Sequence, residues 1–193
     1  MPGPRRASMT PGEPGVITTP NTGTAMIHVC SLADLADTVR HTGASHVLTI
    51  MANVAQVQRP QSVREANHLR VQVDDITEAM QGFIAPNESH VTQVLDFVRA
   101  WDRRAPLVVH CYAGISRSTA SAFAAACMLN PDRSESEIAR RIRTASPIAS
   151  PNRLLVTLAD RALGRNGRML RALDEMGPGD MSVIGRPFRL DLD

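Results

Sequence analysis

Hydrophobic positions follow two patterns along the chain: short continuous apolar runs and longer segments with helical spacing. The runs predict strands at 26–30, 46–51, 69–73 and 107–110. The helical spacing predicts helices at 31–43, 88–103, 117–129, 134–145, 152–164 and 168–176. Strands that alternate with helices in this way predict the α/β class, as a single-domain three-layer sandwich with a central, mostly parallel sheet flanked by helices.

Turn-forming and polar residues indicate where this domain begins and ends. Residues 1–25 are rich in Pro, Gly and Thr and are predicted to be a disordered N-terminal extension. The folded domain is predicted to span 26–173, followed by an extended C-terminal tail at 174–193. Ser31 and Ser134 are predicted helix N-caps, because hydroxyl side chains accept hydrogen bonds from the free backbone N–H groups of a first turn.

Composition narrows the functional class. The chain has 193 residues, of which 43% are hydrophobic, and a formal net charge of only +2. No apolar run approaches the roughly 18 residues that a membrane span needs, and the weak net charge argues against a nucleic-acid partner. No hydrophobic signal segment follows Arg5 and Arg6, so a cytoplasmic location is expected. All basic residues are Arg, which suggests a GC-rich, bacterial source.

The cysteines do not form a disulfide or metal pattern. There are three, Cys30, Cys111 and Cys127, at scattered positions and without CxxC spacing. We therefore expect neither a metal nor another cofactor. Cys30 and Cys127 are interpreted as small core residues, with a regulatory disulfide to Cys111 as the alternative.

The chemistry of the chain is concentrated in the segment HCYAGISRST, which spans 110–119. An apolar strand delivers Cys111 to a short turn, and a helix begins where the turn ends. Such a turn directs backbone N–H groups inward and forms an anion-binding nest, which the positive end of the helix dipole strengthens. The nest is predicted to consist of Tyr112, Ala113, Gly114, Ile115, Ser116 and Arg117. The Arg117 guanidinium matches two phosphoryl oxygens, and the positive surroundings favour the thiolate form of Cys111, the nucleophilic one.

This segment matches the HCxxGxxRS/T signature and resembles the cysteine-based protein tyrosine phosphatase superfamily, most closely its dual-specificity-like and small bacterial members. The similarity extends over about residues 26–165, because the order of elements also fits. The resemblance implies a phosphatase-like fold, with Cys111 as nucleophile, Arg117 as phosphate clamp and Ser118 as a helper that donates to the sulfur. His110 is expected to orient Cys111. The predicted substrate is a phosphorylated protein, phosphotyrosine above all, or a small phosphate ester.

A phosphatase of this kind needs one carboxylic acid to protonate the leaving group and then to act as a base. In the family the acid lies on a loop before the signature, where Asp75 stands here. Asp74 is the alternative, because the register is uncertain by one residue. Adjacent residues at the end of a strand point to opposite faces, so only one of the two can reach the site.

Two further segments carry weaker functional signals. The stretch Ile148–Asn152 resembles one that precedes the last long helix of dual-specificity phosphatases, and it is interpreted as support for the nest. The arginines of segment 134–145 are interpreted as a solvated helix face rather than as a phosphate or nucleic-acid patch.

Two other functions compete with a phosphatase. A rhodanese-like sulfurtransferase also places a cysteine at the start of an anion-binding turn, but it leaves Asp75 without a role. A non-catalytic phosphate-recognition module would typically lack the cysteine or the acid, and this chain has Cys111 together with acid candidates.

Overall fold

The computed structural model describes residues 26–192, so the predicted disordered extension of residues 1–25 lies outside the described residues. The strands are β1 (Met26–Ser31), β2 (His46–Met51), β3 (His68–Gln72), β4 (Leu107–Cys111) and β5 (Phe188–Asp191). The helices are α1 (Leu35–Thr42), α2 (Glu88–Ala100), α3 (Arg117–Leu129), α4 (Glu135–Ala145), α5 (Arg153–Ala162) and α6 (Arg168–Met176). Two short 3₁₀ turns, Val54–Gln56 and Glu65–Asn67, lie between β2 and β3.

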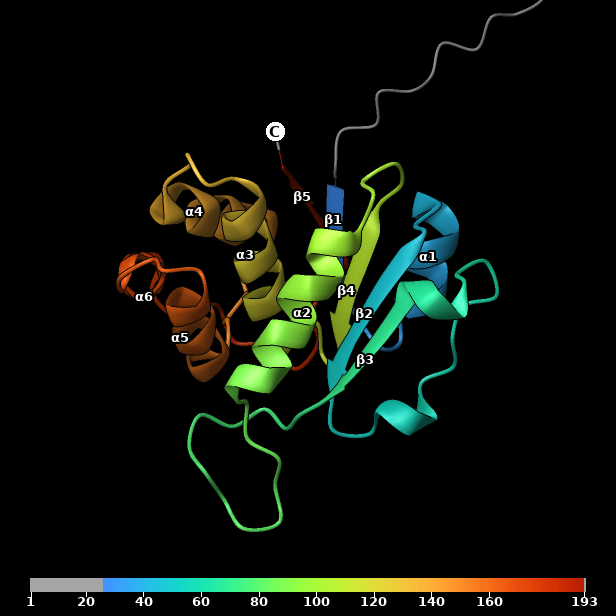
Figure 1. Ribbon diagram of the computed structural model, residues 1–193, viewed down its shortest axis with the longest axis horizontal. Coiled ribbons are helices and arrows are strands. Elements are labelled where there is room, and N and C mark those ends of the chain that lie inside the picture. Colours follow the sequence, from blue (N-terminus) through green and yellow to red (C-terminus); the bar gives the residue numbers. More distant parts are fainter. Residues whose placement is uncertain (1–25, 193) are drawn as a thin grey trace, which may run out of the picture.

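The strands form one sheet in the order β3-β2-β4-β1-β5. The first four are parallel, and β5 runs antiparallel to β1. The predicted α/β fold with a mostly parallel central sheet is therefore confirmed. The loop between β3 and α2 extends from the end of the sheet where the parallel strands finish (Figure 1).

Helices cover both faces of the sheet, α1 one face and α2 to α6 the other (Figure 1). Alternate residues of β1 divide between the two cores: Val29 packs in the large core beneath α2 to α6, and Cys30 packs in the smaller core beneath α1. The inner strand β2, between β3 and β4, is buried along its whole length. A strand buried on both faces reads as a continuous apolar run, which explains why its position was readable from sequence.

The two predicted N-caps have different outcomes. Ser134 is confirmed, because its hydroxyl accepts a hydrogen bond from the backbone N–H of Glu137 at 3.2 Å. The prediction for Ser31 is wrong: this residue pairs with Cys111 as the last residue of β1, and α1 has Asp34 at its N-cap. Because β1 extends through Ser31, the N-cap of α1 lies three residues later, at Asp34. The Ser31 hydroxyl instead donates to the Asp34 carboxylate at 2.6 Å.

The predicted C-terminal tail at 174–193 needs correction. Helix α6 continues to Met176, and residues 188–191 form β5 on the outer edge of β1. Phe188 and Leu190 are buried there. Two apolar residues after a proline give too weak a pattern to predict a strand, since the pairing depends on the exposed edge that β1 offers. No helix within residues 26–192 is long and apolar enough to cross a membrane.

Candidate active site

The loop of residues 111–117 links β4 to α3 at the carboxyl end of the sheet, where ligands bind in open α/β folds. It turns at Gly114, which has a φ of +74°. A Cβ at this position would lie 2.8 Å from the carbonyl carbon of Cys30 and from the amide nitrogen of Ser31. Only glycine therefore allows the loop to pass this close to the end of β1.

Cys111 lies at the bottom of this loop with 1% of its surface exposed. Its Sγ accepts the Gly114 N–H at 3.3 Å and lies 3.2 Å from the Ser118 hydroxyl oxygen. The structure thus brings together the cysteine, a loop amide and the serine that follows the arginine. Donors around a sulfur stabilise its negative form, as a nucleophilic thiolate requires.

Arg117 is the first residue of α3, and only 10% of its side chain is exposed. One terminal nitrogen donates to the Val73 carbonyl at 2.9 Å, which fixes the guanidinium against the end of β3. Its Nε is buried and has no hydrogen-bond partner among residues 26–192. A buried charged donor without a partner is costly, and an oxyanion at this position would satisfy it.

The two candidate acids point to different places. Asp75 accepts hydrogen bonds from the Ser116 hydroxyl at 2.7 Å and the Asn152 amide at 2.8 Å, and its Oδ2 lies 3.6 Å from Arg117 Nε. Asp74 instead accepts the backbone N–H of Ile84 at 2.8 Å, across the base of the β3–α2 loop. Of the two carboxylates, that of Asp75 lies at the 111–117 loop.

The stretch Ile148–Asn152 supports the 111–117 loop from outside, as interpreted from the sequence. The backbone N–H groups of Ser150 and Asn152 donate to the carbonyls of Ile115 and Ser116 at 3.0 and 3.3 Å. What sequence reasoning missed is the side chain of Asn152, which holds Asp75. No local pattern signals a contact between residues so far apart in sequence.

His110 takes part in a buried chain of polar side chains. Its Nε2 lies 2.7 Å from the Thr49 hydroxyl, which lies 2.8 Å from His68 Nε2. Burial lowers the pKa of both His110 and His68 to about 4, so both rings are neutral at pH 7. His110 Nδ1 also lies 3.4 Å from the Cys111 carbonyl oxygen. This contact places the ring beside the backbone of the cysteine, away from proton transfer at the sulfur.

The other two cysteines are buried and free. Burial raises the pKa of Cys30 and of Cys127 to about 12, which keeps both as unreactive thiols. Cys30 belongs to the core beneath α1, and Cys111 belongs to the core on the opposite face of the sheet. Cys111 is also free, so the structure has no disulfide between it and Cys30 or Cys127.

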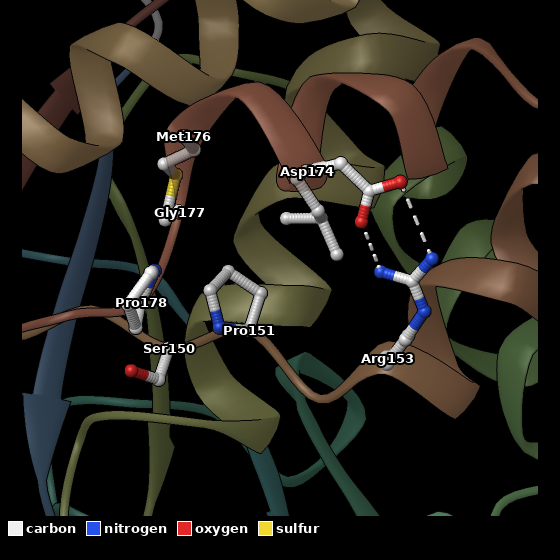
Figure 2. Close-up of a pocket in the computed structure, with 8 residues that line it drawn as sticks. Ser150, Pro151, Arg153, Asp174, Met176, Gly177 and Pro178 are labelled. Atoms are coloured by element: carbon white, nitrogen blue, oxygen red, sulfur yellow. Dashed lines mark hydrogen bonds and ion pairs between the residues drawn. The ribbon is translucent and has the colours of Figure 1, made fainter.

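Two hollows lie on either side of the segment Ser150–Arg153. One, of about 570 Å³, is lined by Asp75, Ser116 and the start of the β3–α2 loop. The other, of about 460 Å³, has Leu173 in its lining. Figure 2 shows the apolar side chains of Pro151, Met176 and Pro178 around it. On its wall Arg153 donates to both carboxylate oxygens of Asp174, at 2.6 and 3.4 Å. A surface that extends from Asp75 past Ser150 therefore offers room for groups attached to a phosphate.

Large apolar side chains are exposed on the 111–117 loop and on the β3–α2 loop. Tyr112, directly after the cysteine, is 65% exposed, and Met80 and Phe83 on the β3–α2 loop are about half exposed. Of these, Met80 lines the hollow beside Asp75. Exposed apolar groups next to a concave polar site are typical of surfaces that bind other molecules.

Comparison with known proteins supports the reading of this region. Residues 79–147, which include the whole 111–117 loop, match the family model of the protein-tyrosine phosphatases. A search of curated proteins finds no sequence match.

Solved phosphatase structures share the fold. The Cydia pomonella PTP-2 phosphatase is 17% identical, with a TM-score of 0.56 over 70% of this chain and 84% of that chain. DUSP15 is 22% identical, with a TM-score of 0.55 over 82% of this chain and 94% of that chain. The human tyrosine phosphatase-like serine/threonine/tyrosine-interacting protein is 17% identical, with a TM-score of 0.56 over 72% of this chain and 92% of that chain.

Proposed function

We propose that this chain is a cysteine-dependent phosphatase of the protein tyrosine phosphatase superfamily, and that it hydrolyses phosphotyrosine in proteins through a phosphocysteine intermediate. The match of residues 79–147 to the family model and the fold shared with a dual-specificity phosphatase support the proposal. The observation that carries the proposal is the arrangement of Cys111, Ser118 and Arg117. The sulfur lies within hydrogen-bond reach of a loop amide and of a hydroxyl, and the arginine at the other end of the same loop has an unused donor.

In the first step the Cys111 thiolate attacks phosphorus and an S–P bond forms. The bond between phosphorus and the leaving oxygen breaks, and Asp75, as a carboxylic acid, gives its proton to that oxygen. The Arg117 guanidinium holds the phosphoryl oxygens, with its Nε turned from Asp75 to the substrate. Asp75, whose Oδ2 lies 3.6 Å from this Nε in the structure, is then free to act on the leaving group.

In the second step water attacks the phosphocysteine. The Asp75 carboxylate takes a proton from the water, the S–P bond breaks, and inorganic phosphate leaves. The Ser118 hydroxyl, 3.2 Å from Sγ, donates to the sulfur as negative charge returns to it. No metal takes part in either step.

The rim of the site favours an aromatic phosphate ester on a polypeptide. Tyr112, Met80 and Phe83 expose apolar surface that a phosphotyrosine ring and its neighbouring residues can cover. A small hydrophilic phosphate ester would leave this surface in water. None of the loop residues adds a second positive charge near Arg117, which disfavours polyphosphorylated lipids.

The test is hydrolysis of p-nitrophenyl phosphate in the presence of a metal chelator. We expect turnover by the native chain and a loss of at least about 10³-fold for Cys111→Ser, because the hydroxyl is a far weaker nucleophile than a thiolate. A trapped phosphoenzyme that is absent in Cys111→Ser would establish the intermediate. Unchanged hydrolysis by Cys111→Ser would overturn the proposal, and no turnover by the native chain would favour a phosphate-recognition module.

The substrate is tested with a phosphotyrosyl peptide and its phosphoseryl counterpart of the same sequence. Faster release of phosphate from the tyrosyl peptide is expected, because its ring covers the apolar rim. A rhodanese-like sulfurtransferase would instead move sulfur from thiosulfate to cyanide and would leave both peptides intact.

A further inference from the structure

The segment after α6 reaches back to the 111–117 loop. The backbone N–H of Gly185 donates to the carbonyl of Ala113 at 2.7 Å. Three residues later the chain enters β5, where Phe188 pairs with Val29 on the edge of the sheet. A residue from the C-terminal segment is thus hydrogen-bonded to the loop that surrounds the Cys111 sulfur.

Gly185 donates its hydrogen bond to the peptide group between Ala113 and Gly114, and the N–H of this same peptide group donates to the Cys111 sulfur. The carbonyl of Ala113 and the N–H of Gly114 belong to one peptide plane, and no peptide bond within residues 26–192 is cis. In a planar trans peptide the C=O and the N–H point in opposite directions. Holding the carbonyl on the outside therefore aims the Gly114 N–H inward, where it meets Cys111 Sγ at 3.3 Å.

The same arrangement recurs at two neighbouring peptides. The Tyr112 carbonyl accepts the N–H of Leu32 at 3.1 Å, and the Ile115 carbonyl accepts the N–H of Ser150 at 3.0 Å. Leu32 and Ser150 belong to segments that adjoin β1 and α5, within the body of the domain. Gly185 differs because it comes from the extended connection between α6 and β5.

We propose that Gly185 is a positioning residue, which sets the orientation of the Gly114 amide toward Cys111 and thereby completes the anion site. The inference rests on the proposed function, since it assigns that amide to thiolate and phosphoryl oxygens. It adds the C-terminal segment to the parts of the chain on which the site depends.

Close packing explains why a glycine stands at this position. A Cβ on residue 185 would lie 3.0 Å from the Gly114 carbonyl oxygen and 3.2 Å from that of Ala113. Contacts this short force neighbouring atoms to shift by a few tenths of an ångström. Here the neighbours are the backbone of the 111–117 loop itself, so a side chain at 185 would displace the amide that Gly185 aims.

The experiment compares alkylation of Cys111 by iodoacetate, an anion that the site attracts, with alkylation by iodoacetamide, its neutral analogue. The ratio of the iodoacetate rate to the iodoacetamide rate measures how strongly the site attracts an anion. Mass spectrometry of the Cys111 peptide excludes signal from other thiols. Gly185→Pro removes the N–H, and we expect it to lower the ratio about fivefold, the effect of one lost hydrogen bond, and to weaken protection by inorganic phosphate. Gly185→Ala keeps the donor and shifts the loop, so a smaller fall is expected.

Phe188→Ala is the matched control. It weakens β5 without touching the hydrogen bond at Ala113, so we expect a lower melting temperature and an unchanged ratio below that temperature. A wild-type ratio in both Gly185 variants would refute the inference, as would an equal fall in Phe188→Ala. If the native chain itself shows neither a preference for iodoacetate nor protection by phosphate, the proposed function fails instead.

Discussion

Asp74 and Asp75 are adjacent carboxylates with different surroundings. Asp74 closes the base of the β3–α2 loop by accepting the Ile84 N–H at 2.8 Å. Asp75 is held by the Ser116 hydroxyl and the Asn152 amide beside the guanidinium of Arg117. The alternation of side chains at the end of a strand separates the two, and this geometry supports Asp75 as the acid.

Neutralising these two residues one at a time tests the assignment. Asp75→Asn is expected to lower kcat for phenyl phosphate by about 10²–10³-fold, because its poor leaving group needs a proton. The deficit should shrink with p-nitrophenyl phosphate, whose leaving group is stable as an anion. Steady-state kinetics on both esters give the measurement.

Asp74→Asn is the matched control, since its amide oxygen still accepts the Ile84 N–H, and we expect kcat to stay within about twofold of the native value. Equal losses in the two variants, or a larger loss in Asp74→Asn, would show that the acid is misassigned.

At this scale the sequence predicted those residues whose spacing is local. Cys111, Gly114, Arg117 and Ser118 fall within one short segment, so the turn and the helix that follows bring them together. The contacts of Thr49 with His110 and with His68 could not be inferred, because they depend on the register between strands far apart in the chain.

Asn152, the N-cap residue of α5, both caps the helix and holds Asp75. The side-chain oxygen of Asn152 accepts the Leu155 N–H at 3.0 Å and caps the helix. Its nitrogen donates to Asp75 at 2.8 Å and to the Ile76 carbonyl at 3.3 Å. The start of α5 therefore fixes the segment that carries the candidate acid.

Two substitutions separate these roles. Asn152→Ser keeps an N-cap oxygen but cannot reach Asp75, whereas Asn152→Ala loses both functions. We expect both variants to lose about tenfold in kcat/KM, while only Asn152→Ala loses about 1 kcal/mol in the free energy of unfolding. Urea denaturation and steady-state kinetics measure the two quantities.

Matching stability losses in the two variants would argue against the capping role. Native kcat/KM in Asn152→Ser would show that Asp75 does not depend on this amide.

Elements with a strong internal pattern were predictable, and those defined by a partner were not. Strand β2 has its predicted bounds, and α2 begins at Glu88 as predicted but ends at Ala100, before its predicted end at Arg103. Strand β5 was missed because only four residues pair with β1, and their strand conformation follows from that edge. The start of α1 was misplaced for a related reason, since β1 extends through Ser31.

At the scale of the whole molecule, the sheet buries titratable side chains on its strands. His68 and His110 lie on different strands and share the Thr49 hydroxyl. Burial lowers both pKa values from 6.5 to about 4. Between these values the unfolded chain binds more protons than the folded one, so the free energy of unfolding rises with pH. This contribution is complete above about pH 6.5 and is lost as the pH falls toward about 4.

We therefore expect each of these histidines to lower the free energy of unfolding by about 1–2 kcal/mol between pH 7 and pH 5. Urea denaturation at a series of pH values gives the slope. His68→Gln still contacts Thr49 but does not titrate in this range, so its slope should be smaller than that of the native chain. Identical slopes would show that His68 is already protonated, or equally free to protonate, in the folded state.

The pairing of β1 with β5 has a consequence for synthesis of the protein. The first described strand finds its outer neighbour only after all six helices have been translated. Until then a row of backbone groups on β1 stays open to other nascent chains, and this strand is where aggregation on the ribosome would start. A protease cut in the connection before β5 would expose the same edge again in the finished molecule.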